Sequence, residues 1–312
     1  MKLARSASVS IHHSQIPEDL PSTTASRSGP SKSGFGHHVF RVAWYGVNTL
    51  LFIALLTVLW SAAWEYSTER YLKGFSDAII PVSAAPAQKV EAILKWMAHT
   101  PARFDQAPES MSDDRNPTDT LNYNSLLSVC GTATNAFLNL AYTGGLTARR
   151  LLLLDANRTT VHVVAEVFIG GRWVVVDPVF HIIFRGVNGQ MLTGDQLANP
   201  AIFSAATKDI AGYEPTYVYD RAVHIRLSHL GPLGRWLRET FGVSDWERWP
   251  ILSLIMERES LEALILFASF ALFLVILRAA LRWYGEAQLG IRTERVRRKL
   301  IRVSRVLFQP AD

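Results

Sequence analysis

The stretch that determines the fold is residues 128–178, SVCGTATNAFLNLAYTGGLTARRLLLLDANRTTVHVVAEVFIGGRWVVVDP. It opens with small residues and continues as an apolar helix from Cys130 to a C-terminal stop at Gly144-Gly145. The β-branched and apolar runs that follow predict three strands, over 147–155, 161–169 and 172–177. The stretch therefore predicts a helix followed by an antiparallel sheet, which is an α+β arrangement.

The last two strands predict a hairpin whose register follows from its turn. A Gly-Gly pair between two alternating runs is a strong signal for a two-residue turn. With Gly170-Gly171 as the turn, Ile169 pairs with Arg172 and the other partners follow in step. His162 and Asp177 then share a face as diagonal neighbours, within hydrogen-bonding reach in a sheet of normal twist. A one-residue bulge would turn one of them to the opposite face.

Cys130 is the only cysteine among 312 residues, which excludes an intramolecular disulfide. It stands at the predicted helix start, where unpaired N–H groups favour an anion, and the thiolate is the nucleophilic form of cysteine. An adjacent imidazole can take the thiol proton, and a carboxylate on the far ring nitrogen orients that imidazole. Cys130, His162 and Asp177 are therefore the candidate catalytic residues for acyl transfer. The competing interpretation is a buried structural cysteine, a structural histidine and a turn aspartate.

Four pieces of this stretch resemble the core of the transglutaminase-like, papain-related superfamily. They are Cys130-Gly131, Gly144–Arg149, His162–Val167 and Gly170–Pro178. The resemblance implies a helix carrying the cysteine, packed on an antiparallel sheet that carries the histidine and the aspartate. It also implies a Cys-His-Asp triad at Cys130, His162 and Asp177, which requires no cofactor and no metal.

Two positions depart from the pattern of that superfamily. Ser128 stands where the family often has glycine, and Val164 stands where it often has tryptophan. Both departures bear on the shape of the cleft, so they weaken inference about the substrate more than inference about the triad.

Charged and aromatic residues around the core have simpler interpretations. Glu166 shares the predicted face of His162 and is expected to pair with Arg149 or Arg150. His181 and His224 are interpreted as structural or surface residues. Before the core, residues 87–98 predict a helix, and after it residues 180–226 predict further strands, such as 217–225, with a turn at Asn188-Gly189.

Two apolar segments flank the core. Val42–Ala63 holds 22 residues without a charge and has aromatic residues at both ends, which predicts a membrane span over 42–64. The tail of about 40 residues in front of it disfavours a cleavable signal peptide. Ala263–Leu277 holds 15 uncharged residues and predicts a second span over 261–281 if the charged ends snorkel. Buried helices of a soluble enzyme are the alternative for both segments.

The charge distribution predicts the topology. Residues 1–41 carry five basic and two acidic residues, residues 278–312 carry nine and three, and the segment between them carries 18 and 22. By the positive-inside rule, both termini are cytoplasmic and the domain at 65–258 lies outside the cytoplasm. Residues 1–41 are predicted to be a disordered tail, and residues 282–312 a basic tail. The formal charge of +5 thus reflects topology, and no nucleic-acid-binding module is indicated.

These features predict a bacterial inner-membrane enzyme that acts on amide bonds of an envelope peptide or protein. The reaction is hydrolysis or acyl transfer, and protease, amidase and cross-linker all fit the resemblance. The alternative is a non-catalytic binding or assembly module of an envelope or surface-polysaccharide machine. The expected partners are a peptide or protein substrate outside the cytoplasm, membrane lipid and, under the alternative, the polysaccharide machinery.

Overall fold

The computed structural model describes residues 33–99, 104–111, 115–224 and 248–290. The chain divides into two compact units, one of residues 45–281 and one of the two chain ends, 1–44 with 282–312. In the smaller unit the ring of Phe40 packs against Gly285, where any side chain would collide with it. The sheet and Cys130 belong to the larger unit. Predictions for residues 1–32 and 291–312 lie outside the described residues.

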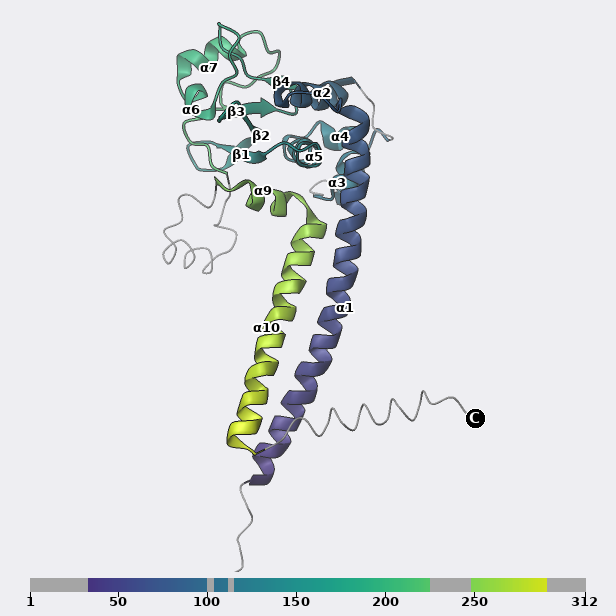
Figure 1. Ribbon diagram of the computed structural model, residues 1–312. Coiled ribbons are helices and arrows are strands. Elements are labelled where there is room, and N and C mark those ends of the chain that lie inside the picture. The colour runs from purple at the N-terminus through teal and green to yellow at the C-terminus, as the bar shows by residue number, and fades with distance from the viewer. Residues whose placement is uncertain (1–32, 100–103, 112–114, 225–247, 291–312) are drawn as a thin grey trace, which may run out of the picture. The chain divides into compact units, whose positions relative to one another are not determined.

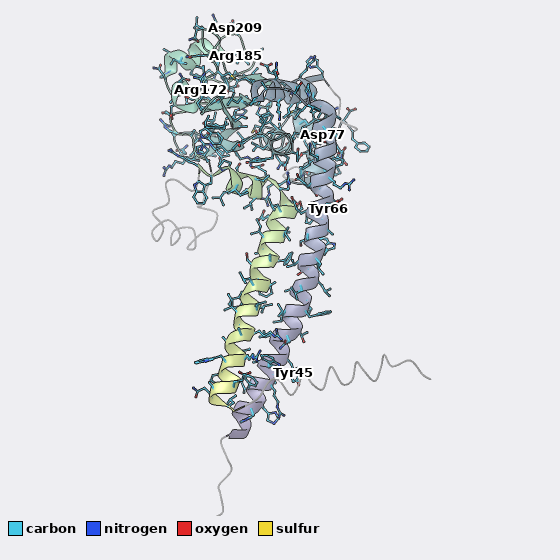
Figure 2. The ribbon with its side chains drawn as sticks, in the orientation of Figure 1. Tyr45, Tyr66, Asp77, Arg172, Arg185 and Asp209 are labelled. Carbon is cyan, nitrogen blue, oxygen red and sulfur yellow. The ribbon has the colours of Figure 1, made fainter. Side chains whose placement is uncertain are left out.

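Two long helices carry the apolar segments (Figure 1). α1 is Ser33–Ile79, with 47 residues, and α10 is Glu259–Gln288, with 30. Both are long and apolar enough to cross a membrane. They contact each other through a cluster of four buried residues, Leu51, Ala54, Ala271 and Leu274. Elsewhere large apolar side chains project from the pair (Figure 2), and Phe52 and Leu266 are each 63% exposed, a surface that suits hydrocarbon better than water.

α1 is longer than the predicted span at both ends. It begins at Ser33, so the prediction of disorder was wrong for residues 33–41. It continues without interruption to Ile79, because the chain has no proline between Pro30 and Pro81 to end it. Its last turns enter the core of the domain, where Leu72 is fully buried.

The sheet has four antiparallel strands in the order β1-β2-β3-β4. Their bounds are β1 Ala148–Leu154, β2 Thr160–Ile169, β3 Arg172–Asp177 and β4 Ile182–Ile183. Ile169 pairs with Arg172 and Ala165 with Val176, which confirms the predicted register. Gly170 and Gly171 have φ angles of 58° and 81°, as a two-residue turn of the type common in hairpins requires.

Helices cover one face of the sheet. α5, Cys130–Thr143, packs on β2 and β1, and its Phe137, Leu138 and Leu140 are fully buried. α2, Pro86–His99, lies against α5, as the periodicity of residues 87–98 predicts. Shorter elements precede α5, namely a 3-10 turn Glu109–Met111, α3 Pro117–Thr120 and α4 Asn124–Leu127. α5 ends at Gly144-Gly145, and the positive φ of Gly145 is the expected C-terminal stop.

The opposite face is covered by residues 180–224, for which the prediction of further strands was correct only in part. Residues 180–224 form β4 and then two helices, α6 Gly194–Leu197 and α7 Pro200–Thr207. The predicted strand at 217–225 is reduced, over its described residues, to one bridge between Val223 and Leu152. The predicted turn at Asn188-Gly189 is present, with Gly189 at a φ of 77°. Aromatic side chains of this segment, rather than a further strand, close the second core cluster.

A buried polar cluster joins the helix pair to the domain, and we call it the junction network. It centres on Glu257, the last residue of α9 (Pro250–Glu257), and on Arg258, which precedes α10. The two side chains belong to residues that are 1% and 3% exposed. Their partners come from α1, α5 and β1, and are Glu65, Glu69, Asn135, Asn139 and Arg150. Ser260, at the start of α10, joins the network through its bond to Glu65.

Candidate active site

Cys130 is the first residue of α5. The preceding residue, Val129, is extended with φ −97° and ψ 131°, so the helix begins at the cysteine. The first N–H groups of a helix have no intrahelical acceptor and favour a negative charge nearby. Thr134, one turn further on, donates to the carbonyl of Val163 at 3.1 Å and so ties the start of α5 to β2. The half-buried thiol is therefore held against the strand that carries His162.

His162 and Asp177 are hydrogen-bonded across the hairpin. The distance from His162 Nε2 to Asp177 Oδ2 is 2.7 Å, and the two side chains are 3% and 0% exposed. The second carboxylate oxygen, Oδ1, accepts the backbone N–H of Val179 at 3.0 Å and of Phe180 at 3.3 Å. Asp177 is thus fixed by the chain that follows β3. Because Nε2 bonds to Asp177, Nδ1 is the ring nitrogen left to face Cys130.

Cys130 and His162 change each other's proton affinity. The hydrogen bond with His162 lowers the pKa of Cys130 below its ordinary value and outweighs the opposing effect of burial. Burial acts against a charged imidazole, but hydrogen bonds with Asp177 and Cys130 outweigh it and raise the pKa of His162 to about 9. The two groups titrate as a pair. At neutral pH this arrangement favours a thiolate beside an imidazolium.

Aromatic rings enclose His162, and sequence reasoning missed them. Tyr217 stacks on the imidazole with a centroid distance of 4.2 Å and an interplanar angle of 8°. Tyr213 and Phe180 meet the same ring edge-on at 6.1 and 6.0 Å. The two tyrosines reach this place through the path of residues 180–217. No local pattern in the sequence indicates that path.

Replacing Tyr217 with alanine is expected to slow alkylation of Cys130 at pH 7 by about 5-fold, because a stacked ring is worth about 1 kcal/mol and also shields the imidazole from water. Tyr217→Phe should keep the wild-type rate, since it keeps the ring. The measurement is the rate of iodoacetamide labelling of the full-length protein. Equal slowing by both variants would instead assign the effect to the hydroxyl group.

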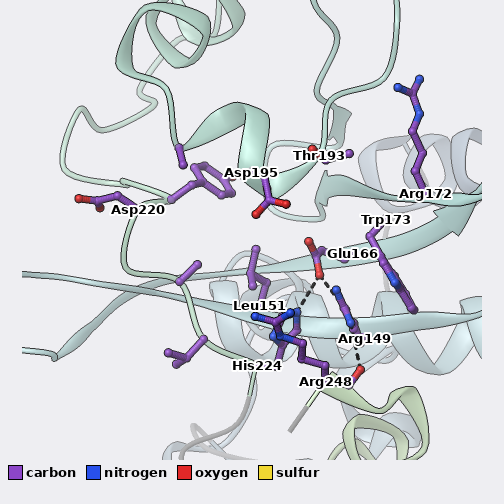
Figure 3. A pocket seen from close by; sticks show the side chains of 15 residues that line it. Arg149, Leu151, Glu166, Arg172, Trp173, Thr193, Asp195, Asp220, His224 and Arg248 are labelled. Atoms are coloured by element: carbon purple, nitrogen blue, oxygen red, sulfur yellow. Dashed lines mark hydrogen bonds and ion pairs between the residues drawn. The ribbon is translucent and has the colours of Figure 1, made fainter. Parts of the chain in front are cut away.

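A second polar cluster lies on the same sheet face and lines a cavity of about 700 Å³ (Figure 3). Its centre is Glu166, which is 5% exposed and whose Oε2 accepts from Arg149 Nε at 2.7 Å and from His224 Nε2 at 2.8 Å. The guanidinium of Arg149 also lies 3.9 Å from the ring centroid of Trp173. Of the two predicted partners for Glu166, Arg149 is confirmed. His224 is structural here, through its bond to Glu166.

No metal-binding arrangement occurs in the described part of the chain, where no group of three His, Cys, Asp or Glu side chains is placed to hold an ion. A thiol at a helix start, an imidazole and a buried carboxylate together can activate a nucleophile and transfer a proton.

Comparison with known families identifies the domain that contains this site. The model of the transglutaminase-like superfamily matches residues 73–178, from the end of α1 through β3. Residues 73–178 are a transglutaminase-like domain. This superfamily is typically related to cysteine peptidases. No curated protein and no solved structure matches the chain.

The transglutaminase-like domain contains Cys130, His162 and Asp177, whereas the two tyrosines beside the imidazole lie beyond the matched residues. The two apolar helices flank the matched domain, α1 before it and α10 after it. Only the last turns of α1 lie inside the match. The three candidate catalytic residues are thus separate in sequence from the tyrosines that pack on His162.

Proposed function

We propose that this protein is a membrane-anchored thiol enzyme that cleaves or transfers amide bonds of a peptide or protein. Cys130 is the nucleophile, His162 the general base and acid, and Asp177 the residue that orients His162. The observation that carries the proposal is the position of His162, which Asp177 holds at 2.7 Å on one ring nitrogen while the thiol interacts with the other side of the ring. No cofactor enters the proposed reaction.

The proposed reaction runs through a thioester. The thiolate of Cys130 attacks the carbonyl carbon of the substrate, and the oxyanion that forms accepts hydrogen bonds from N–H groups at the start of α5. The C–N bond breaks as the imidazolium of His162 gives its proton to the leaving amine. Water or a second amine then attacks the thioester and gives a proton back to His162, and the thiolate leaves. Asp177 stabilises the imidazolium throughout.

Two features support the proposed location, namely the two apolar helices and the charge distribution. Both helices expose apolar side chains, for example Leu59 at 67% and Leu272 at 61%, and basic residues predominate in both chain ends. In a bacterial cytoplasmic membrane, the positive-inside rule places both termini in the cytoplasm and the domain outside it. The substrate class is accordingly a peptide or protein of the cell envelope.

The test is the pH dependence of Cys130 alkylation by iodoacetamide, measured on the full-length protein in detergent. The chain has one cysteine, so the signal has one source. A thiol of ordinary pKa, about 8.5, is less than about 1% thiolate at pH 6. The lowered pKa of Cys130 keeps more of it ionised, while a low-pKa thiolate is intrinsically less nucleophilic. We expect the wild type to react at pH 6 about 10- to 100-fold faster than His162→Ala.

The Cys130–His162 pair determines how labelling and turnover change with pH. Labelling should begin well below the ordinary thiol pKa, and turnover should fall again as the imidazolium loses its proton near pH 9. His224→Ala is the matched control, because His224 is also partly buried and bonded to a carboxylate but belongs to the Glu166 cluster. If Cys130 reacts as an ordinary thiol in all three proteins, the enzyme proposal is wrong and the binding or assembly module takes its place.

A further inference from the structure

The junction network reaches the residue next to the nucleophile. Glu257 is 1% exposed, and its Oε2 accepts from Asn135 Nδ2 at 3.1 Å. Its backbone carbonyl accepts from the same Asn135 amide at 2.6 Å and from Asn139 at 3.0 Å. Both asparagines lie on α5, so the chain segment just before α10 is bonded to the middle of the helix that carries Cys130.

Arg150 extends this connection to the start of α5. It lies on β1, and its Nε is 2.9 Å from Glu257 Oε1 while its Nη2 donates to the carbonyl of Gly131 at 2.6 Å. Its backbone N–H also donates to the hydroxyl of Ser253 on α9 at 2.8 Å. One guanidinium therefore joins the segment before α10 to the residue that follows Cys130.

The contact at Gly131 matters because glycine has the widest backbone freedom of any residue. Outside the backbone of its own helix, no atom lies within 4 Å of the place where a side chain of Gly131 would be, so no neighbouring element packs against this position. The bond from Arg150 therefore adds a restraint from outside α5 to those of the helix itself. Gly131 also supplies one of the first N–H groups of the helix, and these groups govern the charge of the thiol and the site of the oxyanion.

The same network holds the helix pair. Arg258 donates to Asn139 Oδ1 at 3.0 Å and pairs with Glu65 of α1 at 2.9 Å. The hydroxyl of Ser260, in the first turn of α10, donates to the other oxygen of Glu65 at 2.6 Å. A shift between α1 and α10 must therefore either break the bonds of Arg258 and Ser260 to Glu65 or move Arg258 and the adjacent Glu257 against α5.

We propose that Arg150 and Glu257 are positioning residues that couple the arrangement of α1 and α10 to the reactivity of Cys130. When the helix pair is packed as described, Glu257 holds Arg150 in place, and Arg150 holds Gly131 in the conformation that suits the thiolate. When the pair shifts, Gly131 is released and the thiol loses reactivity. This inference rests on the proposed function and adds regulation of the same site by the state of the membrane helices.

The first test compares Cys130 alkylation by iodoacetamide at pH 6 in the full-length protein and two variants. Arg150→Met removes both contacts, and Glu257→Gln removes the ion pair but keeps an acceptor for Asn135. We expect each variant to label about 10-fold more slowly at pH 6 and at nearly the wild-type rate at pH 9, where the thiol ionises without help. If the two residues had a purely structural role, the labelling rate would change in the same direction at pH 6 and at pH 9.

Arg149→Met is the matched control. It removes the neighbouring arginine, which forms a similar buried ion pair with Glu166 at 2.7 Å on the opposite sheet face. It should lower thermal stability and leave the labelling rate at pH 6 unchanged. An equal loss in Arg149→Met would overturn the inference, because the effect would then reflect general destabilisation.

The second test addresses the coupling itself. Ala271 is 6% exposed in the contact between α1 and α10, so Ala271→Leu should displace the pair. We expect it to slow labelling at pH 6 in the wild-type background and to add nothing in the Arg150→Met background. Additive effects would overturn the coupling. If Cys130 of the wild type labels at pH 6 like an ordinary thiol, the proposed function fails. If it labels faster than an ordinary thiol and Arg150→Met labels at the same rate as the wild type, only the coupling fails.

Discussion

Replacing Cys130 with alanine is expected to abolish acylation of this protein by p-nitrophenyl acetate, with the rate of p-nitrophenolate release falling at least about 10³-fold. The thiolate attacks the acetyl carbonyl, p-nitrophenolate leaves, and a thioester remains on Cys130. The chain has no second thiol to replace it. The measurement is the absorbance burst of p-nitrophenolate, whose size should match the amount of protein.

Two further variants serve as controls for the assignment of Cys130 as the nucleophile. Ser128→Ala changes an exposed residue two positions before the cysteine and should keep the full burst. Asp177→Asn should keep a slow burst, because an amide can still contact His162 Nε2 but no longer stabilises a charged imidazole. A burst that persists in Cys130→Ala would show that the acetyl group is accepted elsewhere and would refute the assignment of the nucleophile.

Replacing Arg258 with alanine should cause the largest loss of stability, about 3–5 kcal/mol. Arg258 is 3% exposed and pairs with Glu65 and Glu69 of α1 and with Asn139 of α5. Its removal leaves the carboxylate of Glu65, whose side chain is only 15% exposed, without this counter-ion, which costs more than the lost attraction itself. For a domain of this size, the loss corresponds to a decrease in Tm of roughly 10 °C. Thermal unfolding followed by circular dichroism, with the full-length protein in detergent, measures it.

Arg185→Ala is the control for this prediction. Arg185 pairs with Glu91 at 2.7 Å, but the two side chains are 45% and 53% exposed, so the pair is worth about 1 kcal/mol or less. It should shift Tm by no more than a few degrees. Equal decreases in Tm in Arg185→Ala and Arg258→Ala would mean that the buried junction network contributes no more to stability than an exposed ion pair.

The part of the fold that could be predicted depends on local signals. Gly170-Gly171 between two alternating runs is sufficient to set the pairing of β2 with β3, and this pairing brings His162 and Asp177 together. The irregularity of the sheet falls between β1 and β2, at Leu153 and Leu154, and so leaves that parity intact. Cys130 could be placed at a helix start because small residues and an apolar run mark it.

The errors arose where the local signals were short. α6 has only four residues, too few for a hydrophobic period, and its real signal is the capping box from Thr193 to Gln196. α7 begins at an Asn-Pro pair, with Asn199 as its N-cap and Pro200 as its first residue, which is a start signal that periodicity does not detect. Both signals are local and are present in the sequence.

Other features have no local signal at all. Arg258 and Glu65 are 193 positions apart, and nothing near either residue indicates its partner. The stacking of Tyr217 on His162 likewise depends on the whole path of the chain around the sheet. Such contacts between distant segments become apparent only when the fold is known.

The continuity of α1 also determines how this protein can be cut. Leu72, in the last turns of α1, is fully buried against the core that contains Phe137. Many surface proteins are shed when a protease cleaves the linker between anchor and ectodomain. Here α1 runs directly into the core, and cleavage at its C-terminal turns would remove part of that core. Cleavage in these turns is therefore expected to destabilise the domain rather than to release it intact.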